Sequence, residues 1–451
     1  MPKTFEKIGL QIPQVWLPRP GIDLKRWAVV ACDQYTAQPD YWREVEDFVG
    51  EAPSTLHLVF PEAYLGSPDA EDRIRAIQSK MEAYLSAGLL VPYDGLVYVE
   101  RSVGGRTRQG LIACLDLECY DYQPGVDSLV RSSEGTILER LPPRMRIREG
   151  ALLELPHIQV LVDDPEETVI EPLAGFKPRL KPLYDFDLMQ GGGHLAGWLV
   201  NDPAAESQAL QALQRLASPE VFQQKYGLGR AAQPLLFAVG DGNHSLAAAK
   251  AIWEKIKPSA PADHPGRYAL VEIVNLHNPA LEFKPIHRIL YDVREPLLEA
   301  FYAFLGSNFS YESFSGPQAW DKMMAAIDRC DQAQKGLQAF GLIMPGECGV
   351  AWVTSPSANL VVGTLQSFLD QFMQRGGAEK IDYVHGEDVL RQLSSQIGNV
   401  GFYLPVMRKS DLFKTVILEG ALPRKTFSMG EAHEKRFYME CRRISDGSYQ
   451  D

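Results

Sequence analysis

The chain has 451 residues, a length that allows about three domains. Its 45% apolar and 23% charged residues exclude intrinsic disorder, because a disordered chain has too few apolar groups to offset the entropy of ordering. The net charge of −13 disfavours bulk binding to nucleic acid, whose phosphates attract a basic surface. No apolar run approaches the roughly 20 residues of a membrane span, and no secretory signal is recognisable. We therefore expect a cytoplasmic protein that acts on a small molecule.

Apolar periodicity predicts three regions of mixed strands and helices, at residues 1–120, 121–290 and 291–451. In the first region we expect strands at 27–32, 55–60, 97–100 and 110–117, and helices at 39–49 and 70–88. In the second we expect strands at 157–162, 196–200 and 235–239, and helices at 203–217, 219–226 and 246–257. In the third we expect helices near 295–305, 317–329, 364–375 and 386–394, and strands near 338–343, 349–353, 399–404 and 435–444. Several strands follow one another directly, which favours an α/β fold class of the mixed α+β kind, with irregular mixed sheets and flanking helices.

The motif with the most specific chemistry is a glycine-rich turn between a predicted strand and a predicted helix. Its residues are Gly240, Asp241, Gly242, Asn243, His244 and Ser245. The glycines permit a positive φ and let a ligand approach the backbone. Free N–H groups and the positive end of the helix dipole make such a turn an anion site, most often for phosphate. The alternative is an ordinary turn in which Ser245 caps the helix.

A second candidate is residues 131–148, which hold five arginines and two glutamates in an acidic protein. The planar guanidinium groups of Arg131, Arg140 and Arg144 can each pair with two phosphate oxygens. Glu134 stands among these cations, should stay ionised, and is a candidate metal ligand or general base. We expect a loop stiffened by the two prolines at 142–143. The alternative is a solvated surface loop held by salt bridges.

Four further groups carry weaker signals. His194 follows three glycines at the entrance of a strand, where a ligand or a mobile loop are both possible. His287 and Arg288 follow an extended run and either reach the phosphate turn or form a structural hydrogen-bonded pair. Asp33 follows a predicted strand and either faces a cleft or belongs to a turn. Basic residues between 424 and 436 either close over an anionic ligand or balance local acidity.

The turn occurs together with LEFKPIHR at 281–288, the arginine segment, LYDF at 183–186 and LPRK at 422–425. In this combination the chain resembles, over most of its length, the bacterial and archaeal family called domain of unknown function 1015. The usual turn of that family reads Asp-Gly-His-His-Arg, so Asn243 replaces the first histidine and Ser245 replaces the arginine. The turn is also similar to that of the ParB/sulfiredoxin superfamily, including free-serine kinases, in which it holds nucleotide phosphates. This resemblance implies a ParB/sulfiredoxin-like core, and another arginine must then supply the missing phosphate clamp.

The leading hypothesis is a nucleotide-dependent phosphotransferase that acts on a small metabolite, with an amino-acid hydroxyl as one option. It requires ATP or ADP together with Mg²⁺, and a small anionic ligand as partner. We assign catalytic roles to Glu134, Asp241 and His244, with Mg²⁺ on Glu134 or Asp241. We assign phosphate or substrate binding to Gly240, Gly242, Asn243, Ser245, Arg131, Arg140, Arg144, His194, His287 and Arg288. The alternatives are a non-catalytic nucleotide or phosphate sensor and a phosphoester hydrolase. The sequence leaves the oligomeric state open.

Overall fold

The computed structural model describes residues 3–123, 125–228, 232–333 and 336–445, and the chain forms two compact units. The first unit comprises Met1–Glu282 and Met429–Asp451, and the second comprises Phe283–Ser428. The boundary predicted near residue 120 lies within the first unit, because strands from both sides of it share one sheet. The boundary predicted near 290 lies close to the start of the second unit. Within the described residues, no helix combines the length and the apolar character that a membrane span needs.

A large mixed sheet forms the centre of the first unit, so the predicted fold class of mixed α/β with irregular sheets is confirmed. In spatial order its main strands are β11 (Lys181–Asp187), β12 (His194–Val200), β5 (Leu96–Val103), β6 (Arg106–Asp116), β14 (Tyr268–Asn275), β10 (Gln159–Val162), β13 (Phe237–Asp241), β8 (Val130–Ser132) and β7 (Tyr120–Asp121). Strand β10 runs parallel to β14 and antiparallel to β13, and β13 runs parallel to β8. The sheet therefore joins segments from both ends of the first unit.

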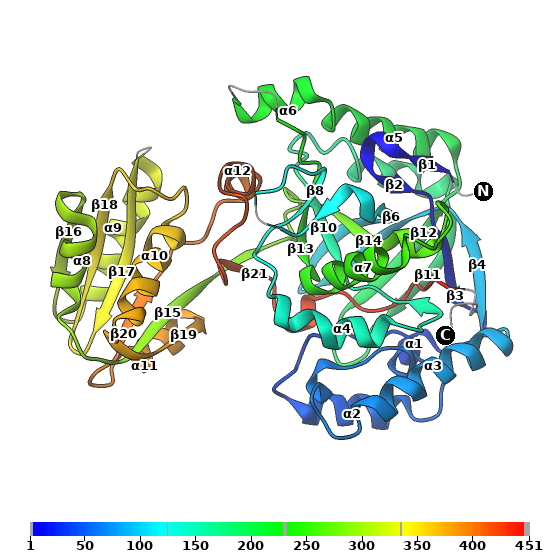
Figure 1. Cartoon of the computed structure of the whole chain (residues 1–451), viewed down its shortest axis with the longest axis horizontal. Helices are drawn as coiled ribbons and strands as arrows, with labels where there is room; N and C mark the ends of the chain where they lie inside the picture. The colour runs from blue at the N-terminus through cyan, green and yellow to red at the C-terminus, as the bar shows by residue number, and fades with distance from the viewer. Residues whose placement is uncertain (1–2, 124, 229–231, 334–335, 446–451) are drawn as a thin grey trace. The chain divides into compact units, whose positions relative to one another are not determined.

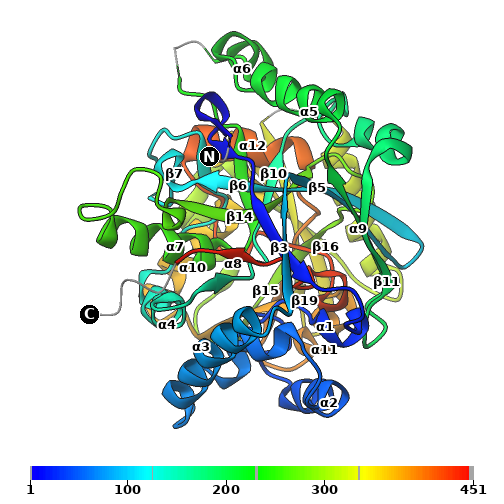
Figure 2. The ribbon, with the colours of Figure 1, turned by 90° about the vertical axis from the view of Figure 1, so that its right-hand side faces the viewer.

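Helices cover both faces of this sheet. Side chains along each strand alternate between the two faces, so each face has apolar side chains that pack against helices. Val97 and Val99 of β5 pack in the cluster that contains the residues of α1 (Leu24–Trp27), α2 (Pro39–Val49) and α3 (Ala70–Ser86). Leu96 and Tyr98 pack in the opposite cluster with α5 (Pro203–Leu216) and α7 (Asn243–Ile256). In both ribbon views α1, α2 and α3 lie on one side, and α5 and α6 (Pro219–Tyr226) lie on the other (Figures 1 and 2).

The second unit is built around its own sheet and its own core. In spatial order the strands are β16 (Phe309–Phe314), β18 (Glu347–Thr354), β17 (Leu337–Met344), β20 (Val400–Tyr403), β15 (Phe283–Val293) and β19 (Ala378–His385), and β21 (Phe427–Met429) also pairs with β15. The helices of this unit are α8 (Leu297–Leu305), α9 (Ala319–Ala333), α10 (Val361–Gln374), α11 (Glu387–Ser394) and α12 (Lys409–Glu419). Most of these elements match the sequence prediction to within a few residues, although α12, β15, β16 and β19 were not predicted.

Four local predictions are wrong. Residues 27–32 form only an isolated bridge at Val30, although the run is almost wholly buried. Residues 55–58 form a 3₁₀ turn, whose start is capped by the Ser54 hydroxyl. Residues 141–148 form helix α4 (Leu141–Arg148) and not a loop, because prolines in the first turn of a helix lose no hydrogen bond. In the tail, only Arg442–Arg443 is a strand, β22.

The close packing of β11 on β12 predicts a strong effect of a single methyl group. An added Cβ at Gly197 would overlap the ring of Tyr184 on the neighbouring strand. We expect Gly197→Ala to lower the free energy of unfolding by about 1–3 kcal/mol, measured by urea denaturation. Gly175→Ala is the matched control, since nothing lies within 4 Å of its added Cβ. An equal loss in both variants would contradict the packing argument.

Candidate functional site

The glycine turn has the geometry of an anion site. Strand β13 ends at Asp241, Gly242 has a φ of +78°, and α7 begins at Asn243. Gly242, not Ser245, precedes the helix, and no side chain caps it. An added Cβ at Gly242 would also lie 3.0 Å from the Cα of Ile158, so the position favours glycine on both counts. A helix N-terminus without a side-chain cap is the kind of backbone arrangement that binds anions.

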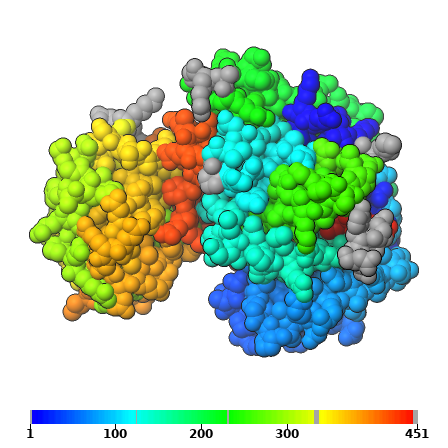
Figure 3. All heavy atoms as spheres, viewed as in Figure 1, coloured from blue at the N-terminus to red at the C-terminus, as the bar shows by residue number. Residues whose placement is uncertain are grey.

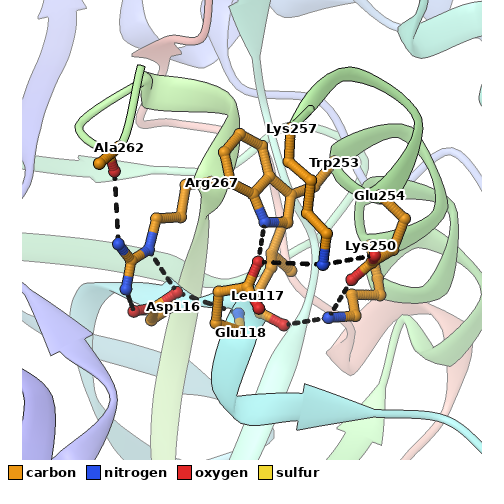
Figure 4. Close-up of polar contacts among 9 residues, drawn as sticks. All are labelled: Asp116, Leu117, Glu118, Lys250, Trp253, Glu254, Lys257, Ala262 and Arg267. Atoms are coloured by element: carbon orange, nitrogen blue, oxygen red, sulfur yellow. Dashed lines mark hydrogen bonds and ion pairs between the residues drawn. The ribbon is translucent and has the colours of Figure 1, made fainter. Parts of the chain in front are cut away.

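Helix α7 is anchored at its far end, which fixes the direction of its N-terminus. The indole N–H of Trp253 donates to Glu118 at 2.5 Å, and Lys257 lies 3.5 Å from the same carboxylate. Arg267 binds both oxygens of Asp116, at 3.0 and 2.6 Å, next to these contacts (Figure 4). These contacts join α7 to the end of β6. The position of the turn thus depends on the central sheet and not on the loop alone.

The segment after β8 lies against the turn. The Ser133 hydroxyl donates to the carbonyl of Val239 at 2.5 Å, and the backbone N–H of Ile137 donates to His244 Nε2 at 3.4 Å. In the part of the chain that the structure describes, the buried Oδ1 of Asn243 and the buried Oγ1 of Thr136 have no hydrogen-bond partner. Unpartnered buried polar atoms are uncommon, and a bound water, ion or ligand is one of their explanations.

Helix α4 brings an arginine to the same place. It packs against α7, and the surfaces of the two helices adjoin in Figure 3. A cavity of about 140 Å³ lies beside them. Its lining includes Arg144 from α4 and Ser245 from α7, together with Glu62 and His157. The cavity therefore brings one predicted arginine together with Ser245, the last residue of the predicted motif.

Glu62 is the carboxylate of this cavity, and the sequence analysis did not single it out. Its carboxylate lies 2.5 Å from the guanidinium of Arg144, and both side chains are largely buried. Its backbone N–H donates to the carbonyl of Cys32 at 2.8 Å, which fixes its position. Burial raises the pKa of Glu62 and outweighs the lowering effect of Arg144. A carboxylate with a raised pKa is a stronger base than an exposed one.

A buried chain of polar groups leads from Asp33 into the same cavity. His157 Nδ1 lies 2.8 Å from the hydroxyl of Tyr438, and His157 Nε2 lies 3.4 Å from Asp33. Burial alone would lower the pKa of His157, but the charge and hydrogen bond of Asp33 raise it well above its usual value. The same pairing lowers the pKa of Asp33, against the effect of burial. His157 is therefore an imidazolium held against a carboxylate.

Three other predicted residues of the first unit have different surroundings. The guanidinium of Arg131 donates to the carbonyls of Ser128 and Gln233, at 3.0 and 3.2 Å. Arg140 is exposed at the start of α4, and its carbonyl accepts from Arg144. His194 lies on the β11–β12 hairpin, with aspartate oxygens at 2.8 and 2.7 Å from its two ring nitrogens. Their predicted phosphate-binding and substrate-binding roles stay predictions.

His287 and Arg288 lie on β15 in the second unit, and both are buried there. His287 is 1% exposed, and its Nδ1 accepts the backbone N–H of Leu404 at 3.1 Å. Burial, with the nearby Arg288, lowers the pKa of His287 to about 4, so this ring is neutral at pH 7. The Arg288 guanidinium donates to Gln366 at 3.3 Å and to the carbonyl of Arg424 at 2.9 Å. Both residues hold the second unit together.

The carboxylates predicted to bind Mg²⁺ do not form a preformed metal cage. Asp241 Oδ1 accepts the N–H of Gly242 at 2.9 Å, and its Oδ2 pairs with Lys435 at 3.0 Å. Among the residues that the structure describes, no group of three or more histidine, cysteine, aspartate or glutamate side chains could hold a metal ion. Glu134 is half-buried and has polar partners of its own. The Mg²⁺-binding roles of Asp241 and Glu134 stay predictions.

The comparisons with known proteins identify the family. The chain belongs to the family described as protein of unknown function (DUF1015), which matches residues 17–372, so the resemblance seen in the sequence is confirmed. No curated protein matches the chain in sequence.

Similar solved structures include a free serine kinase in complex with ADP. It has 9% sequence identity and a TM-score of 0.37, and the match covers 73% of this chain and 91% of that chain. A conserved hypothetical protein from Pyrococcus furiosus has 9% identity and a TM-score of 0.32, over 73% and 90% of the two chains. SbnI from Staphylococcus aureus, with a C-terminal truncation, has 8% identity and a TM-score of 0.35, over 75% and 90%. These similarities are too low to carry an argument about activity, and the ParB/sulfiredoxin-like core stays a prediction.

Because His157 pairs with Asp33, we expect the loss of stability on replacing His157 to depend on pH. A raised pKa in the folded state stabilises the fold below the unfolded value of about 6.5, and the gain disappears as the pH rises through the folded pKa. We expect His157→Gln to cost about 1.5–3 kcal/mol at pH 6 and clearly less at pH 10, measured by urea unfolding. In His57→Gln the trend should reverse, because burial lowers the pKa of His57. A pH-independent loss for His157→Gln would contradict the ion pair.

Proposed function

We propose that this protein is a nucleotide-dependent phosphotransferase that phosphorylates a hydroxyl group of a small metabolite. One observation carries the proposal: Arg144, Glu62 and Ser245 line a single cavity at the N-terminus of α7. Phosphoryl transfer needs phosphate positioning, charge neutralisation and an acceptor for the hydroxyl proton. The α7 turn, the arginine and the glutamate can supply these three functions in that order.

The phosphates of the nucleotide would bind at the turn. Backbone N–H groups of the first turn of α7 would donate to the phosphates, and the positive φ of Gly242 shapes the turn that presents them. Lys435 lies 3.0 Å from Asp241 and adds a cation beside the turn. Magnesium in phosphotransferases is usually bound by one or two carboxylates together with the substrate phosphates and water, so Asp241 and Glu134 stay the candidate protein ligands.

The cavity would hold the acceptor. Its volume of about 140 Å³ is well below the roughly 300–1,000 Å³ of pockets that enclose a whole cofactor, so the nucleoside would lie outside it. The hydroxyl oxygen of the acceptor forms a bond to the γ-phosphorus while the bond to the bridging oxygen of the nucleoside diphosphate breaks. Glu62 accepts the hydroxyl proton, and Arg144 offsets the charge on the transferred group. Glu62 thus takes the role that the sequence hypothesis assigned to Glu134 or Asp241. An amino-acid hydroxyl as acceptor stays a prediction.

Substitution of the two cavity residues separates chemistry from binding. We expect Glu62→Gln to lower the rate of ATP-dependent phosphorylation by about 10²–10⁴-fold while ATP still raises the melting temperature as in the wild type. We expect Arg144→Gln to lower both the rate of phosphorylation and the rise in melting temperature that ATP causes. The assay would offer a panel of hydroxylated amino acids and small alcohols with ATP and Mg²⁺. Arg146→Gln is the control, because Arg146 lies on the same helix but pairs with Glu71 at the surface.

Each alternative function has its own outcome in this assay. Phosphate release without an acceptor would indicate a hydrolase. Stabilisation by nucleotide without turnover on any acceptor would indicate a sensor. Full activity of Glu62→Gln would show that Glu62 is not the base.

The turn itself is tested by Asn243→Ala combined with His244→Ala. We expect this double variant to weaken ATP binding by about 1–3 kcal/mol, the scale of hydrogen bonds to charged groups, measured by isothermal titration calorimetry. Arg146→Gln again serves as the control. Unchanged affinity in the double variant would remove the turn from the proposed site.

A further inference from the structure

A second cavity of the first unit lies at the β5–β6 hairpin and is lined by three arginines. Its volume is about 250 Å³, and its lining includes Arg101, Arg106 and Arg108. Arg101 and Arg108 stand directly opposite each other on the paired strands, and Arg106 is opposite Val103. Residues two apart on a strand share a face, so all three side chains start from one face of the sheet. Like charges directly opposite each other destabilise a hairpin, so this arrangement needs another explanation.

Arg101 is buried without a carboxylate partner. It is 2% exposed, and its guanidinium donates to the carbonyls of Ser102 and His433 at 3.1 and 3.0 Å. Its buried Nε has no hydrogen-bond partner, and no carboxylate lies within ion-pair distance of it in the described ranges of the chain. The ring of Phe437 covers the group, with its centroid 5.2 Å away. A buried cation that is only partly compensated is costly for the fold.

Among the described residues, Arg108 has one close carboxylate, Glu272, and shares it with Arg436. Arg108 is 8% exposed, and its Nε lies 3.5 Å from Glu272 Oε1. The other oxygen of Glu272 pairs with Arg436 at 2.7 Å. Burial, together with the charge of Arg108, lowers the pKa of Arg101 to about 9, despite the opposing effect of Glu272. The positive charge at this cavity is therefore only partly neutralised from within.

The two carboxylates in the lining are already engaged. Glu282 pairs with Arg106 at the exposed rim. Glu434 accepts the backbone N–H of Glu431 at 2.5 Å. The lining holds three guanidinium groups and two carboxylates, and Glu272, which is not in the lining, offsets part of the charge of Arg108.

We propose that this cavity, the arginine cavity, binds a small anion that carries a phosphate or carboxylate group. The buried guanidinium of Arg101 supplies the fixed charge, and Arg106 and Arg108 supply further donors in the fork geometry that suits oxyanions. The volume of about 250 Å³ limits the ligand to a small metabolite or to the anionic end of a larger one. The arginine cavity shares no lining residue with the cavity of Arg144, so the proposal does not depend on the proposed function.

The test uses the full chain with Asn243→Ala and His244→Ala as the parent, so that phosphate binding at the α7 turn is impaired from the start. Inorganic phosphate and malonate are the probes, in isothermal titration calorimetry at low salt. We expect at least one probe to bind the parent, and Arg101→Met to raise its dissociation constant tenfold or more. Arg146→Gln in the same parent should leave the dissociation constant unchanged. The proposal would be overturned if neither phosphate nor malonate bound the parent, or if the parent and Arg101→Met bound the probe equally well.

A second variant keeps the test decisive if Arg101→Met does not fold. Arg106 is exposed at the rim, so Arg106→Gln should retain the melting temperature of the parent. We expect it to weaken binding of the same probe threefold or more, with the larger loss at low salt because the interaction is ionic. An unchanged dissociation constant in a folded Arg106→Gln would count against the arginine cavity. The relative affinity of phosphate and malonate then identifies which oxyanion group the site prefers.

Discussion

The left-handed backbone of Gly242 connects β13 to α7 without a capping side chain, and the candidate site depends on this connection. Because no cap is present, the helix N-terminus keeps its N–H groups and its dipole for an external anion. The position of that N-terminus is fixed from a distance, since Trp253 binds Glu118 at the other end of α7. The packing of α4 on α7 then brings Arg144 to the same cavity.

The C-terminal segment that returns to the first unit completes both cavities. Lys435 pairs with Asp241 at the turn, and Tyr438 binds His157 at the cavity of Arg144. The carbonyl of His433 accepts from Arg101 at the arginine cavity. Residues within six positions of one another thus contact both sites.

Arg131 and Arg144 belong to the same arginine-rich segment, but their guanidinium groups have different surroundings. Arg131 lies on β8, and its guanidinium is used by carbonyl groups of the neighbouring loops. Arg144 lies on α4, where it reaches over the cavity and pairs with Glu62. The composition of the segment predicts a cluster of cations, but the position on the helix also decides which of them lines the cavity, since Arg146 of α4 pairs with Glu71 at the surface. This is also why a carboxylate distant in sequence, Glu62, joins the site.

The sequence by itself determined the mixed α/β class, most helices, the strand–turn–helix motif at 240–245 and the family. The class, the helices and the motif follow from local periodicity and from glycine, which act over a few residues. The family follows from the resemblance that several motifs carry together. Only the tertiary structure decided that Glu62, His157 and Tyr438 meet beside Arg144, and that His287 is a core residue of another unit. Contacts between residues far apart in the chain depend on sheet order and helix packing. A single sequence carries no local signal for either.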